Sequence, residues 1–383
     1  MAIRANPRLV EELELYGAED VSKCYHCGNC SAVCPFSREP FLFPRKSMRY
    51  LQMGLEKKLQ GTLEPWLCYY CGECSEQCPR DAEPGETMMS MRRWLTSRYD
   101  FTGISGLFYR SWKAELAAIF LVAFLTGAGL LLFGFNWGGG DLSVYAGEGA
   151  FLTTAKIHYF DWILGAVLGG LLGINCARMW WFSIGSDKKL KIPLVSYVKH
   201  AFLLPLHFFT QKRYAECEKK RPWVIHLVLM LSYTTMLVLI MFFLHSMHTE
   251  KTVWTAHAFG YLATAGLLGT AIYAIHGRIR KTETHYKHSH ETDWIFLGLL
   301  VFVAGTGILQ NVLYRFFGLD TAANAVYVIH MMGVVPMLGL EVPFSKWAHL
   351  AYRPLGMYFS ELQAEAIREK ELVATGVGAP QAA

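Results

Sequence analysis

Eight of the ten cysteines fall into two runs with the same spacing. The first run is Cys24, Cys27, Cys30 and Cys34 followed by Pro35, and the second is Cys68, Cys71, Cys74 and Cys78 followed by Pro79. Each has the form C-x2-C-x2-C-x3-C-P, with which thiolates hold a cubane 4Fe-4S cluster, and the fourth cysteine of each run ligates the other cube. The expected ligand sets are therefore crossed: Cys24, Cys27, Cys30 with Cys78, and Cys68, Cys71, Cys74 with Cys34.

Two other uses of cysteine fit the spacing less well. Residues 1–20 are polar and charged and carry no signal-peptide pattern, so the disulfide framework of a small secreted domain is not expected. Structural zinc uses more widely separated pairs of cysteines, and it would leave the third and fourth thiols of each run without a role. Cys176 and Cys217 lie outside both runs and are expected to be ordinary residues.

The composition divides the chain into a polar and an apolar part. Hydrophobic residues make up 53% of the sequence and the net charge is only +5, which argues against nucleic-acid binding. The apolar excess follows residue 112, where stretches long enough to cross a lipid bilayer recur. We count six such stretches, at about 112–135, 160–183, 223–245, 253–275, 293–316 and 322–344.

Basic residues predict the orientation of these spans. The connection after the second span is rich in lysine and arginine, whereas residues 136–155 contain almost none, so the positive-inside rule places the former in the cytoplasm. With six crossings, both termini and the cysteine runs lie on that same side. We expect a multi-pass protein of the inner membrane, with its thiols in the reducing cytoplasm.

The polar part reads as helical. Residues 7–16 and 45–54 carry helical apolar patterns, and no convincing pair of alternating strands precedes residue 112. The predicted fold is all-α, with a helical ferredoxin-like domain holding two 4Fe-4S clusters before a six-helix transmembrane bundle. The predicted domains are 1–111, the transmembrane region 112–355, and a polar cytoplasmic tail at 356–383.

Histidines lie near both ends of the apolar stretches. An imidazole at membrane depth needs a partner or a cofactor. His330 and His349 are 19 residues apart, about 28 Å along an unbroken helix, although Pro336 and Pro343 are expected to shorten or bend that path. One helix thus offers a ligand near each membrane face, which is typical of a two-haem cytochrome b. His285, His288 and His290 are expected to form solvated loop.

The last span resembles the gamma subunit of respiratory nitrate reductase, a di-haem b quinol oxidase subunit. The resemblance lies in Val328 to His330 and in Val342 to His349, with its Pro-Phe-Ser-basic turn; it extends to Trp223 to His226. It implies that His226 and His349 hold the cytoplasmic-side haem and that His330 ligates the outer haem. Met236 stands where that family has its second outer ligand, so His257, or His245 as the alternative, is expected to replace it.

The polar part resembles the smaller iron-sulfur subunit of heterodisulfide reductase, an electron-relay protein with two 4Fe-4S clusters. The match lies in 45–49, in the second cysteine run with Trp66 and Arg80, and in Met91 to Arg93. A fusion of the two parts resembles the membrane subunit of the quinone-interacting oxidoreductases of sulfate-reducing prokaryotes. That resemblance implies two haems b, menaquinone as substrate, two soluble flavin and iron-sulfur partner subunits, and adenylylsulfate reductase downstream.

The expected function is thus menaquinol oxidation with electron relay, at a quinone site near His330. No residue pattern indicates a stand-alone catalytic site in the soluble domain. Two alternatives stay open: the equivalent subunit of a heterodisulfide- or sulfite-reductase-linked complex, and, in another class, an iron-sulfur redox sensor or membrane anchor.

Overall fold

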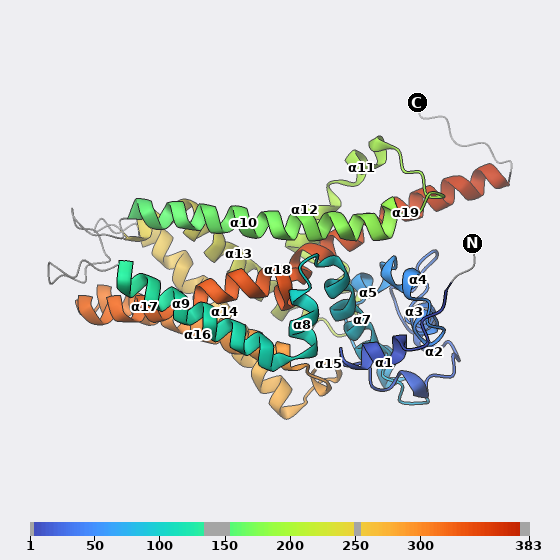
Figure 1. Ribbon diagram of the computed structural model, residues 1–383, viewed down its shortest axis with the longest axis horizontal. Coiled ribbons are helices and arrows are strands. Elements are labelled where there is room, and N and C mark those ends of the chain that lie inside the picture. Colours follow the sequence, from blue (N-terminus) through green and yellow to red (C-terminus); the bar gives the residue numbers. More distant parts are fainter. Residues whose placement is uncertain (1–3, 134–153, 249–253, 376–383) are drawn as a thin grey trace.

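The computed structural model describes residues 4–133, 154–248 and 254–375. Within these ranges the regular elements are helices, and the only β-type pairing is an isolated bridge between Arg38 and Phe41. The molecule is elongated, with a bundle of long helices at one end and a domain of short helices at the other (Figure 1). The prediction of an all-α fold is confirmed.

Short helices separated by turns build the N-terminal domain. They are α1 (Leu9–Glu14), η1 (Val21–Lys23), α2 (Asn29–Ala32), α3 (Arg45–Gln52), α4 (Glu56–Gln60), α5 (Glu64–Leu67), α6 (Glu73–Glu76), α7 (Pro84–Tyr99) and α8 (Ile104–Arg110). The longest of them, α7, packs against α1, α3, α5, α6 and α8. It buries Met88, Met91, Trp94 and Leu95, so this helix organises the core around which the cysteine runs fold.

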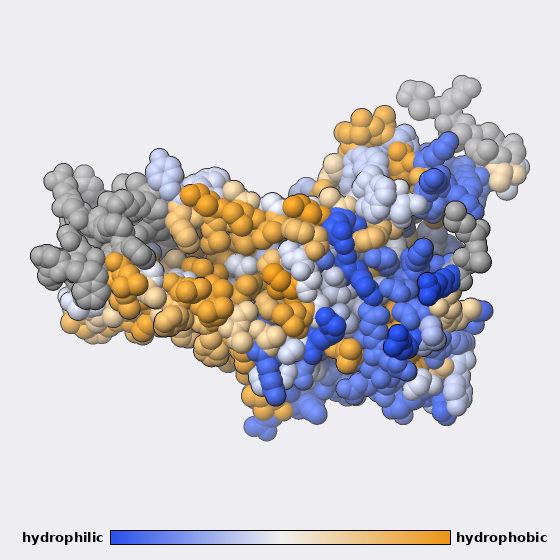
Figure 2. Space-filling view, viewed as in Figure 1, coloured by the Kyte–Doolittle hydropathy of each residue, from blue (hydrophilic) through white to orange (hydrophobic). Residues whose placement is uncertain are grey.

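Six helices are long and apolar enough to cross a membrane, at Trp112–Leu132, Tyr159–Gly185, Arg221–Phe243, Trp254–Arg280, Glu291–Arg315 and Thr321–Phe344. They belong to α9 (Trp112–Phe133), α10 (Thr154–Trp180) with η2 (Trp181–Gly185), α13 (Arg221–His248), α14 (Trp254–Arg280), α16 (Glu291–Arg315) and α17 (Asp320–Pro336). Figure 2 shows an apolar surface over this bundle and a hydrophilic one over the N-terminal domain. The six predicted stretches are thus confirmed as helices that are long and apolar enough to cross a membrane.

The spans are joined on the N-terminal-domain side by short helices. These are α11 (Leu194–His200), α12 (Leu203–Thr210) and η3 (Tyr214–Glu216) before α13, and α15 (Thr284–Lys287) before α16. In the bundle α13 packs on α14, α14 on α16, α16 on α17 and α17 on α9.

The last span, Thr321–Phe344, is not one continuous α-helix. After Pro336 the chain forms a π-helix, η4 (Met337–Glu341), then α18 (Val342–Phe344), η5 (Lys346–Ala348) and a new helix, α19 (His349–Ala374). Proline removes a helical hydrogen bond and crowds the preceding turn, which explains the break that Pro336 and Pro343 predicted.

Helix α19 continues away from the bundle and lies beside the N-terminal domain (Figure 1). It buries Met357, Phe359 and Leu362 in the same core cluster as Leu13, Trp66 and Trp94. At Gly356 the helix comes so close that an added Cβ would lie 2.6 Å from the Cβ of Trp66. The sequence predicts a polar tail at 356–383. It does not predict the buried face of α19, because charged residues flank the buried ones in the sequence.

Candidate metal and haem sites

The two cysteine runs have the same backbone conformation. His26 and Tyr70 have φ of 58° and 55°, and Gly28 and Gly72 both have φ of 92°. Each glycine opens a one-turn helix, α2 or α6, that carries the third cysteine of its run. A positive φ costs glycine little because it has no Cβ, so the two glycines allow the tight turn between the second and third thiols.

The first cavity is lined by Cys24, Cys27, Cys30 and Cys78. Burial raises the pKa of the Cys30 thiol to about 11, and the neighbouring sulfurs of Cys24, Cys27 and Cys78 raise it further. The fourth cysteine of the second run is thus brought to the first run. Four thiols around one cavity have the donor chemistry that a cubane requires.

The second set gathers in the same crossed manner. Burial raises the pKa of Cys34 to about 12, and the neighbouring sulfurs of Cys68 and Cys71 raise it further. The pKa of Cys74 lies well above its usual value for the same reason, with further effects of Cys68, Cys71 and Cys34. Cys34 therefore lies with the second run, as the crossed sets require, while cluster ligation itself stays a prediction.

A site for a single metal ion would need a different arrangement. Across the described ranges, no group of three or more His, Cys, Asp or Glu side chains is arranged to hold such an ion. A single ion needs donors that converge on one point, whereas a cubane presents a separate iron to each thiolate.

Residues 20–82 match the family of 4Fe-4S dicluster domains. No curated protein matches the chain as a relative. The chain thus carries a dicluster domain at its N-terminal end, followed by a helical region with six candidate membrane spans. This is the make-up of a membrane electron-transfer subunit.

Cys217 lies against the dicluster domain, although it was expected to be an ordinary residue. It is 1% exposed, and its thiol shares a hydrogen bond with Cys71 that lowers the pKa of Cys71 to about 7. A lone cysteine in a loop carries no spacing signal, so no local pattern connected it with the second run.

Two arginines converge on the backbone of the second run. Arg353 donates to the carbonyl oxygen of Cys68 at 3.1 Å, and Arg92 donates to the same oxygen. Burial lowers the pKa of Arg92 to about 9, and repulsion by Arg353 adds to the effect. Arg353 also lies 4.0 Å over the ring of Tyr69. These cations place positive charge between the second cysteine set and the membrane bundle.

A pocket beside Tyr69 contains the predicted inner haem ligands. Its lining includes His207, Gln211, His226, His349 and Arg353, together with Tyr69, Phe208, Met230, Leu350, Pro354 and Met357. The ring centroids of His226 and His349 are 6.3 Å apart. Imidazole nitrogens bind metals at about 2 Å, the value known for zinc, so two rings that bound one metal from opposite sides would have centroids about 6 Å apart. The residues present therefore fit an iron between the two rings.

Both rings in this pocket are fixed by hydrogen bonds at Nδ1. Nδ1 of His226 lies 2.9 Å from Oε1 of Gln211, and Nδ1 of His349 contacts the carbonyl oxygen of Lys346. A donor N–H at Nδ1 leaves Nε2 as the free lone pair, which is how proteins orient metal-binding histidines. The positions of the histidines in the sequence do not predict a role for Gln211, because Gln211 lies before α13 and only the packing brings it to His226.

The outer histidines are arranged differently. Nδ1 of His330 is 3.0 Å from Oγ1 of Thr306 on α16, and the ring packs on Gly307. His257 is 2% exposed and its Nε2 has no hydrogen-bond partner among the described residues. Within that part of the chain, no ring contact joins His330 to His257. The side chain of His245 lies outside the described residues, so the second outer ligand stays a prediction.

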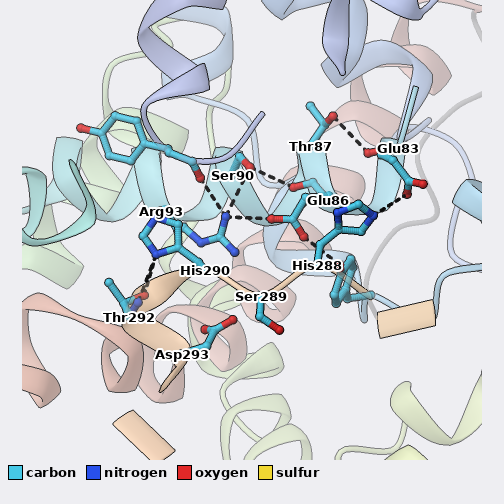
Figure 3. A network of polar contacts seen from close by, with 12 residues as sticks. Glu83, Glu86, Thr87, Ser90, Arg93, His288, Ser289, His290, Thr292 and Asp293 are labelled. Carbon is cyan, nitrogen blue, oxygen red and sulfur yellow. Dashed lines mark hydrogen bonds and ion pairs between the residues drawn. The ribbon is translucent and has the colours of Figure 1, made fainter. Parts of the chain in front are cut away.

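The loop histidines are not simply solvated. His288 lies 3.6 Å from Glu83, and His290 is the N-cap of α16, where its side chain accepts from the backbone amide of Thr292. Figure 3 shows these residues against α7 beside Arg93 and Glu86. Burial lowers the pKa of His290 to about 3. The loop therefore docks the bundle onto the dicluster domain, and the expectation of solvated loop is wrong for His290.

Proposed function

We propose that this protein is the membrane subunit of a quinone-linked oxidoreductase, which passes electrons from menaquinol to soluble partners. The observation that carries the proposal is the neighbouring pair His226 and His349, with ring centroids 6.3 Å apart, in a pocket that also contains Tyr69 from the second cysteine run. A haem site and a cluster site thus share one wall. A redox sensor or a simple anchor would need no such junction.

The ligands follow from this arrangement. His226 and His349 would hold the inner haem b, and His330, with His257 or His245, the outer one. The two crossed cysteine sets would hold the cubanes. When bound, these groups supply one-electron transfer, whereas the protein supplies axial ligands, burial and hydrogen bonds that set their potentials.

The cubanes would also have an order. Tyr69 and the carbonyl of Cys68 adjoin the histidine pocket through Arg353, so the set of Cys34, Cys68, Cys71 and Cys74 is the one nearer the inner haem. The other set lies at the surface: Cys27 is exposed and Tyr25 is 71% exposed. We infer that the soluble partner receives electrons there.

The finer proposal is that the chain is the membrane-spanning component of a quinone-interacting membrane-bound oxidoreductase complex (QmoC). Its partners would be two soluble flavin and iron-sulfur subunits on the cytoplasmic side, which deliver electrons to adenylylsulfate reductase in sulfate respiration. Support comes from the joining of a dicluster domain to six candidate spans with histidines in the positions described above.

The test is the optical spectrum of the purified full-length protein. We expect reduced-minus-oxidised bands of low-spin haem b, and loss of one haem per chain in both His226→Ala and His349→Ala. The matched control is His200→Ala, a histidine that pairs with Glu365 at 3.1 Å instead, and its haem content should be unchanged. A wild-type protein without haem bands would refute the proposal and favour a sensor or anchor.

A further inference from the structure

Two glutamates are completely buried at the end of the bundle that meets the dicluster domain. Glu115 lies in the first turn of α9, and Glu341 is the last residue of η4. Both are 0% exposed. Ionisable side chains within membrane spans are costly to bury and usually have a function. Two such carboxyls at one place therefore mark a candidate binding site.

The two carboxyl groups meet each other. Each carboxyl is among the groups that act on the other, and the hydroxyl of Ser345 donates to Oε1 of Glu115 at 2.6 Å. Three carboxyl oxygens have no hydrogen-bond partner among the described residues. They are both oxygens of Glu341 and Oε2 of Glu115. The groups that lie next to Glu341 are the Ser345 hydroxyl and the backbone amide of Lys346.

This contact requires a proton. A carboxylate only accepts hydrogen bonds, so two carboxyls can bond to each other only when one of them is protonated. Two buried like charges at this distance would also repel strongly, as in paired catalytic carboxylates. In the part of the chain that is described, no lysine, arginine or histidine forms an ion pair with either glutamate to offset that repulsion.

The charged groups around the pair also indicate that the pair holds one proton. Lys346 contacts Asp293, Arg278 lies 3.7 Å from Asp293, and Arg93 pairs with Glu86 at 2.9 Å. Figure 3 shows Arg93 and Glu86 with Asp293 beside them. The buried Tyr109 also faces the pair and Asp293. The region thus holds four carboxyls, Glu86, Glu115, Asp293 and Glu341, and three cations, Arg93, Arg278 and Lys346. One proton on the pair makes this region neutral.

One residue connects the pair to the histidine pocket. The backbone amide of Lys346 lies beside the Glu341 carboxyl, and the carbonyl oxygen of the same residue contacts Nδ1 of His349. A change of charge on the pair therefore changes the electrostatic potential at His349, a predicted haem ligand, through the single residue Lys346. In a buried, low-dielectric region such an effect is only weakly screened.

We propose that Glu115 and Glu341 form a proton-binding site coupled to the inner haem position. The pair holds one proton when the inner site is oxidised. When that site gains an electron, ultimately from the quinol, the remaining carboxylate takes one proton from water on the dicluster-domain side and becomes a carboxylic acid. The proton is returned when the electron leaves. The coupling, though not the shared proton, rests on the function proposed above.

Infrared spectroscopy of the full-length protein in nanodiscs tests the shared proton without reference to any cofactor. We expect a protonated carboxylic acid band at pH 7 that shifts in D2O and is lost in both Glu115→Gln and Glu341→Gln. Glu365→Gln, which changes a carboxylate that pairs with Lys199, is the matched control and should keep the band. A wild-type spectrum without the band, or a band that survives in both variants, overturns the site.

A redox titration tests the coupling. The midpoint potential of the inner haem should fall as the pH rises in the wild-type protein, and this slope should be lost in Glu341→Gln. A flat wild-type profile overturns the coupling. If haem bands are missing altogether, the proposed function fails while the infrared result still decides whether the pair holds a proton. Cluster absorbance and elution as a single species establish that each variant is folded.

Discussion

The inner and outer halves of the bundle hold their histidines in different ways. On the inner side, the rings of His226 and His349 lie 6.3 Å apart and are both fixed at Nδ1. On the outer side, His330 is fixed by Thr306, but among the described residues no second ring faces it. A site whose ligands are already oriented loses little freedom on binding. The comparison indicates that the inner pair of histidines is already oriented, whereas His330 has no second ring beside it among the described residues.

The largest effect is expected from His330→Ala, which tests the outer side of this comparison. If the outer site depends on His330, the variant loses one of two haems, and the rate at which quinol reduces the cubanes falls by at least about tenfold, typical for the loss of a single essential contact. Dithionite should still reduce both cubanes, which electron paramagnetic resonance measures. Unchanged haem content and unchanged quinol-driven reduction would mean that His330 does not belong to a haem site. The comparison of an inner with an outer haem site would then be wrong.

A smaller effect is expected from Gln211→Leu. This change removes the acceptor of His226 while both axial ligands stay, and loss of such a partner typically weakens metal binding by about 10-fold to 100-fold. Haem transfer to an excess of apomyoglobin measures the affinity. Thr306→Val is the matched outer change. Because the outer site is less preorganised, it should have the weaker effect, and the opposite order would break the comparison.

The smallest expected effect is on the stability of the protein at acidic pH. Burial lowers the pKa of His207 in the inner pocket to about 4, whereas an unfolded histidine titrates near about 6.5. The folded state therefore binds fewer protons than the unfolded state between these values, so stability falls as the pH drops from about 6.5 towards 4. His207→Phe should reduce this loss in thermal unfolding measured at pH 7 and pH 5. An identical loss in the variant would show that the pKa of His207 is the same in the folded and unfolded states.

The elements that could be predicted from the sequence are those encoded by local patterns. The spans are continuous apolar stretches, and the crossed cysteine sets follow from a repeated spacing that fixes three thiols within one short segment. Gln211, Cys217 and Arg353 could not be found in this way. Each comes from a segment far away in the sequence, and its partner is set by how the helices pack.

The same limit applies to the C-terminal residues. The buried side chains of α19, such as Phe359 and Leu362, alternate with charged residues, so composition alone indicated a polar tail. The histidines show an intermediate case. Their positions along the spans were predictable, but only packing determines that His226 meets His349 while His330 meets Thr306.

The helix α19 has a consequence for the biosynthesis of the protein. Domains generally fold as they leave the ribosome, N-terminal parts first. Here the core around Trp66 and Trp94 is closed by Met357, Phe359 and Leu362, which are translated only after all six spans. The domain that is made first is therefore completed last, because its core closes only after the six candidate spans have been translated.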